Sequence, residues 1–124
     1  MGKKKTCGFE DLRVYQMAEQ LSDEIWDVVS AWDSFSKDTV GKQLVRAADS
    51  VGANIAEGAG RGSYQDNRRF IRIARGSLYE TRHFLRRAHK RNLLATAQTD
   101  FIKPLVAELT PTLNAYLNSI GATQ

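Results

Sequence analysis

The side chains best suited to binding chemistry are the cations between Arg61 and Arg91, where ten Lys or Arg residues stand against only two acids. Six of these cations and one tyrosine recur at steps of three and four residues. Because an α-helix turns about 100° per residue, all seven side chains would project within about 80° of one another. This set, called the arginine ridge below, comprises Arg68, Arg72, Arg75, Tyr79, Arg82, Arg86 and Lys90.

Like charges at this spacing repel one another on an isolated helix, at a cost of a few tenths of a kcal/mol per pair. A solvated helix face normally mixes signs, so the arginine ridge predicts an anionic partner. We interpret it as a surface for nucleic acid, in particular structured RNA, with the cations on phosphates and Tyr79 available for stacking. Such contacts carry no sequence specificity. Four to six of them would give log affinity against log salt a slope near −4 to −5 on duplex.

The arginine ridge is also compatible with two roles that need no nucleic acid. One is an ordinary solvated face. The second is ion pairing with acidic faces of the same fold or of sister subunits, because the first expected helix is rich in Asp and Glu. The alternative function is an oligomeric scaffold or accessory protein whose arginines dock an acidic protein, such as a nucleic-acid enzyme.

Residues that could support catalysis or hold a metal are sparse. His83 and His89 lie six residues apart, whereas histidine pairs on helices bind metals at i, i+3 or i+4. Cys7 stands alone, and the segment EGAGRG lacks both a GK[ST] sequence and a preceding strand. Glu57 and Glu80 lack the Glu-x-x-His motif of di-iron bundles, so a helix cap and an ion pair are simpler roles. We predict no enzymatic activity, no catalytic residue, no metal site and no cofactor.

The overall composition is that of one small soluble domain. At 124 residues the chain can bury about two-thirds of its unfolded surface around a single core. Its one cysteine excludes an internal disulfide and fits a reducing compartment, so we expect a cytoplasmic protein. No apolar run approaches the roughly 18 residues of a membrane span, and we expect no membrane partner. The net charge of +4 is moderate, so the clustering of cations is the stronger indication of nucleic acid.

Hydrophobic periodicity predicts four helices and no strands, and hence an all-α antiparallel up-down four-helix bundle with short loops. The expected helices span residues 9–32, 39–59, 63–91 and 96–120 of a single domain, residues 9–120. Residues 1–8 and 121–124 are expected to be terminal tails. On the third helix, opposite the arginine ridge, we assign a core-facing side to Phe70, Ile73, Ala74, Ser77, Leu78, Phe84, Leu85 and Ala88.

Several single residues carry predictions about local structure. Asp38 or Thr39 is expected to cap the second helix, and Ser63 the third. Gly76 costs the third helix about 1 kcal/mol relative to alanine, so we expect another helix backbone to pack tightly there. Pro111 should kink or split the fourth helix, because proline removes a hydrogen-bond donor and clashes with the preceding turn.

The second helix carries a polar stripe beside its small-residue core face. Ser50 and Asn54 are poor residues for a helix interior, which favours a hydrogen-bonded contact with the third helix or with another subunit over plain solvation. The polar stripe comprises Gln43, Arg46, Ser50, Asn54, Glu57 and Arg61. The acidic side of the first helix comprises Glu10, Asp11, Glu19, Asp23, Glu24 and Asp27.

Two segments, QLVRAADSVGANIAEGAGRGS and FIRIARGSLYETRHFL, resemble the 23S rRNA intervening-sequence proteins, a bacterial family also called four-helix bundle proteins. The opening FEDLRVYQMAEQL fits the start of that family, and the resemblance covers about residues 9–94. Pro111 is a departure from the family pattern. The residues that carry the resemblance are Gln43, Arg46, Ala47, Ser50, Asn54, Ile55, Ala56, Glu57, Gly58, Ala74, Gly76, Ser77, Glu80 and Leu85.

The resemblance implies an antiparallel bundle assembled into a homopentameric ring with a positively charged surface, without implying a defined molecular activity. A ring requires two different, mutually complementary faces, for which the acidic first helix and the polar stripe are candidates. A distantly similar group, the accessory variability proteins of diversity-generating retroelements, forms similar pentamers that bind nucleic acid and a reverse transcriptase. By analogy, a nucleic-acid-processing protein is the implied further partner.

Overall fold

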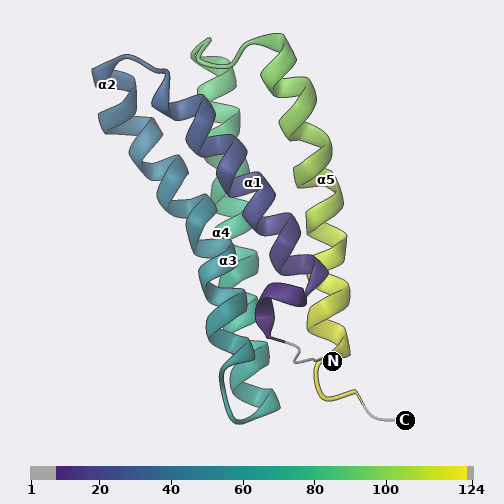
Figure 1. Ribbon diagram of the computed structural model, residues 1–124. Coiled ribbons are helices and arrows are strands. Elements are labelled where there is room, and N and C mark those ends of the chain that lie inside the picture. The colour runs from purple at the N-terminus through teal and green to yellow at the C-terminus, as the bar shows by residue number, and fades with distance from the viewer. Residues whose placement is uncertain (1–7, 123–124) are drawn as a thin grey trace, which may run out of the picture.

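The computed structural model describes residues 8–122, which form a bundle of four long helices (Figure 1). These are α1 (Arg13–Ser30), α3 (Lys42–Ala59), α4 (Tyr64–Lys90) and α5 (Thr96–Ser119). Three short helical segments precede α1 and α3, namely η1 (Phe9–Asp11), α2 (Ser34–Ser36) and η2 (Lys37–Gly41). No strand occurs between residues 8 and 122, so the all-α class is confirmed. Cys7 and the expected tails at 1–7 and 123–124 lie outside the described residues.

The four helices alternate in direction along the chain (Figure 1). Each packs against its two antiparallel neighbours, in the pairs α1–α3, α3–α4, α4–α5 and α5–α1. The parallel helices α1 and α4 therefore occupy diagonal corners of the bundle. As a result, the acidic helix and the helix with the arginine ridge face away from each other. None of the helices in residues 8–122 is long and apolar enough to cross a membrane.

The core lies along the bundle axis and receives side chains from every long helix. Each fully buried aliphatic side chain stabilises the fold by about 1.5–3 kcal/mol relative to exposure, before cavity and strain effects. The largest fully buried side chains are Leu21, Ile25, Leu44, Ile55, Ile71, Leu78, Leu109, Leu113, Val51 and Thr81.

The core-facing side of α4 differs from the predicted one. Ile71 and Thr81 are fully buried, whereas the predicted core residue Ile73 is 44% exposed. The observed buried positions Ile71, Ala74, Leu78, Thr81 and Ala88 follow a heptad-like pattern that the prediction missed. The physical reason is that α4 must face both α3 and α5, so its core side is centred between them. The Thr81 hydroxyl donates a hydrogen bond to the Ser77 carbonyl at 2.8 Å and is satisfied.

The helix that we expected at residues 39–59 begins earlier, at Ser34, and comprises α2, η2 and α3 in succession. Asp33 is its N-cap, so the predictions for Asp38 and Thr39 were wrong, and both lie inside the π-helical segment η2. This wider turn coincides with a close approach to α1. A Cβ on Gly41 would lie 2.8 Å from Val29 Cγ1. Only glycine fits this contact without displacing α1.

Because the Asp33 side chain caps this helix, we expect its contribution to the stability of the fold to depend on pH. Its carboxylate accepts hydrogen bonds from the Ser36 backbone N–H (3.0 Å) and hydroxyl (2.9 Å). These bonds lower the pKa of Asp33. The stability from the charged cap is thus present above the ordinary aspartate pKa of about 3.9 and lost as pH falls through the lowered value. We expect Asp33→Ala to lower the melting temperature at pH 7 and to converge on the original protein in acid, by circular dichroism.

Asp33→Asn is the matched control for the pH series, because asparagine caps helices about as well but does not titrate. Its melting temperature should exceed that of Asp33→Ala at neutral pH and also at pH 3. A difference between Asp33→Ala and the original protein that stayed constant from pH 7 down to pH 2 would contradict the cap.

Of the other predictions about helix ends and interruptions, the one for Ser63 is confirmed and the splitting of the last helix at Pro111 is not observed. Ser63 caps α4 as predicted, since its hydroxyl accepts the Asp66 backbone N–H at 3.1 Å. Asn92 ends α4 in the left-handed conformation, with φ of 62°. Pro104 and Pro111 both lie inside the single helix α5, so Pro111 does not split it. Both prolines are exposed, where water can solvate the carbonyl that each leaves without a helical partner.

The close approach between helices occurs at Gly58 of α3, not at Gly76 of α4. Gly58 is buried, and a Cβ there would lie 2.6 Å from Asn67 Oδ1 and 3.1 Å from Phe70 Cβ. Gly76 is exposed, and nothing outside its own helix lies within 4 Å of its Cβ position. The prediction for Gly76 was therefore wrong within the isolated chain.

Candidate nucleic-acid interface

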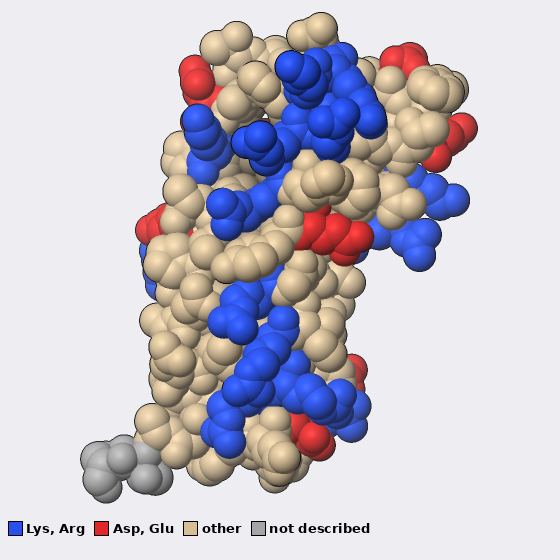
Figure 2. Space-filling view, turned by 180° about the vertical axis from the view of Figure 1, so that it is seen from behind, with Lys and Arg blue, Asp and Glu red and all other residues tan. Residues whose placement is uncertain are grey.

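Most of the arginine ridge is exposed along the outer side of α4. Figure 2 shows Lys and Arg side chains gathered in a band that runs down this face of the molecule. From Arg68 to Lys90 the band covers about 33 Å of helix, at 1.5 Å per residue. The exposed members of the ridge are Arg72, Tyr79, Arg82, Arg86 and Lys90.

Two members of the arginine ridge are half-buried and hold α5 against α4. The Arg68 guanidinium donates to the Ile120 carbonyl at 2.8 Å, and the Arg75 guanidinium donates to Asn114 Oδ1 at 3.0 Å. Arg68 also lies beside Gly121, whose φ of +75° turns the chain at the end of α5. Four cations of the ridge, Arg72, Arg82, Arg86 and Lys90, are thus left exposed for a ligand.

The contact of Arg68 predicts a structural role that its neighbour Arg72 lacks. We expect Arg68→Ala to lower the free energy of unfolding by about 1.5–3 kcal/mol, because a charge-assisted hydrogen bond is lost and a half-buried carbonyl is left unpaired. The matched control is Arg72→Ala, whose exposed side chain should change stability by less than about 0.5 kcal/mol. Urea unfolding followed by circular dichroism measures both. Equal destabilisation by the two variants would contradict the assignment.

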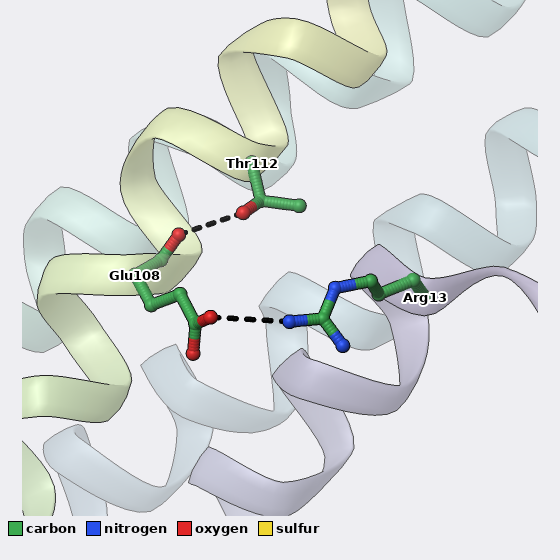
Figure 3. A network of polar contacts seen from close by, with 3 residues as sticks. All are labelled: Arg13, Glu108 and Thr112. Atoms are coloured by element: carbon green, nitrogen blue, oxygen red, sulfur yellow. Dashed lines mark hydrogen bonds and ion pairs between the residues drawn. The ribbon is translucent and has the colours of Figure 1, made fainter.

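No ridge cation forms an ion pair with another residue in the range 8–122. The ion pairs there are Arg13–Glu108 (3.1 Å), Arg61–Glu57 (3.0 Å) and Arg69–Asp66 (3.6 Å). Figure 3 shows the first of these joining α1 to α5, where the Glu108 carbonyl also accepts the Thr112 hydroxyl. Pairing with acids of the same chain therefore does not account for the ridge.

Tyr79 lies near the middle of the exposed cations. Its side chain is 50% exposed, and the Arg82 guanidinium lies 5.4 Å from the ring centroid. This distance allows a cation–π interaction. The pair presents an aromatic surface and a positive charge at the same point of the ridge.

Five further cations extend the band and were not part of the predicted ridge. Arg61 and Arg69 lie 4.7 and 4.6 Å from the centroid of the Phe70 ring at one end of α4. Arg87 and Arg91 are exposed at the opposite end. Arg69 and Arg87 project about 100° away from Arg68 around the helix, outside the 80° sector that defines the arginine ridge. The exposed side of α4 is wider than that sector because α4 packs against only two helices.

Lys103 of α5 is the fifth of these cations. It lies eleven residues before Asn114, which is about three helical turns, so both residues belong to the side of α5 that faces α4. Its side chain is exposed. The antiparallel packing that pairs Arg75 with Asn114 brings Lys103 to the level of Arg86. Sequence periodicity within one helix could not reveal this neighbour.

The polar stripe lies on the side of α3 next to α4. Gln43, Arg46, Glu57 and Arg61 are exposed, whereas Ser50 and Asn54 are half-buried. Asn54 Nδ2 donates to the Ser50 carbonyl at 2.8 Å, a bond within α3 rather than the predicted one to the next helix. Glu57 forms the expected type of ion pair, with Arg61.

Of the α4 residues that carry the family resemblance, Gly76 and Glu80 are exposed and Ser77 lies partly inside the bundle. Ser77 is half-buried and accepts the Thr81 hydroxyl through its carbonyl. Glu80 is exposed and forms no ion pair with any residue that the structure describes. Glu80 lies in the middle of α4, so neither the helix cap nor the ion pair that we expected is found for it among residues 8–122.

Residues that could hold a metal do not gather in the described part of the chain. Residues 8–122 contain no group of three or more His, Cys, Asp or Glu side chains arranged to bind a metal ion. His83 and His89 are both exposed on α4.

An acidic groove lies between α1 and α3. Its volume is about 350 Å³, and Glu19, Asp23 and Asp49 line it together with small residues such as Gly52. The Tyr15 hydroxyl donates to Glu19 Oε2 at 3.3 Å. Burial, followed by the negative charge of Glu19, raises the pKa of Tyr15. The acidic groove and the arginine ridge are thus built by different helix surfaces, the first by α1 and α3 and the second by α4.

Comparisons with known proteins agree with this architecture. The family model described as "23S rRNA-intervening sequence protein" matches residues 10–115. A solved structure from Bacteroides thetaiotaomicron, a protein with unknown function from the S23 ribosomal protein family, is similar with a TM-score of 0.75. The two chains are 21% identical over 86% of this chain and 99% of that chain, a likeness that shows the fold alone. No curated protein matches the chain.

Proposed function

The chain belongs to the 23S rRNA-intervening sequence protein family, and we propose that it is a non-catalytic protein that binds structured RNA along α4. The observation that carries the proposal is the line of exposed cations Arg72, Arg82, Arg86 and Lys90, none of which forms an ion pair with a residue in the described range 8–122. Successive cations four residues apart on a helix are separated by about 6 Å of rise, which suits a polyanion lying alongside. Guanidinium groups bind phosphate through paired hydrogen bonds.

Binding of a labelled RNA hairpin, measured by fluorescence anisotropy from 50 to 300 mM salt, tests the proposal. Four phosphate contacts on a duplex predict a slope of log affinity against log salt near about −3.6. A DNA duplex of the same sequence reports the preference for RNA, since only RNA carries the 2′-hydroxyl. Affinity independent of salt, or no binding at 50 mM salt, would overturn the proposal.

We also propose that copies of the chain assemble into a closed ring of five. The acidic side of α1 and the polar stripe of α3 are the candidate faces for a heterologous contact, in which two different faces of neighbouring copies meet, and this contact leaves the arginine ridge of α4 free. Five copies of 13.9 kDa have a mass of about 70 kDa, which light scattering measures directly. A ring would repeat the ridge five times and raise RNA affinity through multivalency. A monomer at all concentrations would exclude this assembly.

A second candidate is a scaffold that docks an acidic protein, such as a nucleic-acid-processing enzyme. The observation in its favour is that arginine dominates the ridge, because the planar guanidinium pairs with carboxylates as readily as with phosphates. Affinity capture from a lysate, with and without nuclease treatment, separates the two functions. A protein retained after nuclease treatment supports docking, whereas one lost with the RNA supports the first proposal.

A further inference from the structure

A hollow of about 330 Å³ opens at the end of the bundle where the second long helix begins and α4 ends. It lies at the lower end of the size range of small-ligand sites. None of the residues that line it belongs to the arginine ridge or to the residues that carry the family resemblance. The lining residues are Phe35, Ser36, Thr39, Val40, Arg91 and Leu93.

Local structure fixes both walls of the hollow. Phe35 lies in the first turn of its helix, two residues after the Asp33 cap, and the Thr39 hydroxyl donates to the Phe35 carbonyl at 2.7 Å. On the opposite wall, the left-handed Asn92 reverses the chain so that the Leu93 N–H bonds to the Ala88 carbonyl at 3.0 Å. This C-terminal motif places Arg91 and Leu93 in the lining of the hollow.

The chemistry of the hollow combines an aromatic ring, an apolar floor and a cation. Phe35 is 77% exposed, the largest exposure among the large hydrophobic residues of the described chain, while Val40 is buried and Leu93 half-buried. Arg91 is exposed and forms no ion pair with a residue between 8 and 122. A planar group that carries a negative charge would cover the ring and neutralise the guanidinium.

The hollow lies at the end of α4 where the arginine ridge stops, because Arg91 both lines it and ends that helix. Lys90, the last residue of the ridge, directly precedes Arg91, and Arg87 lies one turn earlier on α4. The band of cations in Figure 2 includes this end of the molecule. A nucleic acid whose phosphates follow the ridge would therefore bring its next nucleotide to the hollow.

We propose that the hollow binds one unpaired nucleotide next to a duplex, with its base stacked on Phe35 and its phosphate on Arg91. The inference rests on the proposed RNA binding for the duplex itself. Exposed aromatic side chains are the usual platforms for unstacked bases, and stacking tolerates any base sequence. The hollow would thereby favour the junction between paired and single-stranded RNA.

The test compares a fully paired RNA hairpin with the same hairpin extended by four unpaired uridines at either its 5′ or its 3′ end. In anisotropy titrations, one of the two extensions should raise the affinity of the original protein by about 5- to 150-fold. Phe35→Ala should bind the paired hairpin as the original protein does and lose the gain from the extension. Phe35→Trp should keep that gain, because indole also stacks on bases.

Trp26→Ala removes another exposed aromatic, on acidic α1, and should leave the gain unchanged. Melting curves of all variants verify folding. Hairpin binding without a gain from either extension, or an equal gain in Phe35→Ala, overturns the inference and leaves the proposed function intact. No binding of any RNA overturns both. A lower mass of Phe35→Ala in light scattering would show that a second copy of the chain covers the ring, and would also overturn the inference.

Discussion

Replacing Arg82, Arg86 and Lys90 together by glutamine is expected to weaken binding of an RNA hairpin by about 500-fold at 0.1 M salt. This factor follows from counterion release, in which each phosphate contact adds about −0.9 to the salt slope and thus contributes about eightfold at 0.1 M relative to 1 M. The slope should fall from about −3.6 to about −0.9. Glutamine preserves helix propensity, so α4 should persist.

The matched control replaces Lys37, Lys42 and Arg46 by glutamine. These three cations are exposed on η2 and α3, and their loss changes the net charge by the same amount. If the ridge binds RNA, the control should retain most of the affinity and most of the salt slope. Equal losses in both triple variants would mean that net charge, rather than the ridge, governs binding.

The melting temperature of the ridge variant tests whether unfolding of α4, rather than loss of phosphate contacts, weakens binding. Removing like charges from neighbouring turns relieves repulsion of a few tenths of a kcal/mol per pair, so its melting temperature should stay the same or rise slightly. A ridge variant that melts earlier than the original protein would instead indicate that these cations stabilise the fold.

Gly58→Ala is expected to lower the free energy of unfolding by about 1–3 kcal/mol, because it overpacks the contact between α3 and α4. The new Cβ would lie 3.1 Å from the Asn67 carbonyl oxygen, a backbone atom of α4, and 3.1 Å from Phe70 Cβ, whose position is fixed by that backbone, so neither atom can move alone. Asn67 Oδ1, at 2.6 Å, is already buried without a hydrogen-bond partner in the described chain. The gain in helix propensity from glycine to alanine is smaller than the cost of overpacking this contact.

Gly76→Ala makes the same substitution on α4, and we expect it to raise the free energy of unfolding rather than to lower it. Its Cβ position is open, so alanine should raise stability by about 0.5–1 kcal/mol through helix propensity alone. Urea unfolding of both variants, with the m-value as a check on two-state behaviour, measures the difference. A stabilising Gly58→Ala would refute the close helix contact, and a destabilising Gly76→Ala would reveal a neighbour of α4 that the single chain lacks.

The helices and the exposed part of the ridge could be predicted from the sequence because both depend on spacing within one segment. The apolar period locates the long helices to within a few residues, except where α2 and η2 extend the second one. The same geometry that turns the chain by about 100° per residue aligns Arg72, Arg82 and Arg86 in any straight α-helix. Ser63 was recognisable as a cap for the same reason, since a cap contacts only its own first turn.

Only the tertiary structure decided which of these residues are free to bind a ligand. Arg68 and Arg75 belong to the ridge by spacing, yet they bond to Ile120 and Asn114 because α5 returns antiparallel beside α4. Whether a glycine lies at a tight contact depends likewise on the helix that packs against it. We expected the tight contact at Gly76, and it occurs at Gly58. The hollow at Phe35 joins segments more than fifty residues apart, and such contacts arise from packing rather than from any local period of the chain.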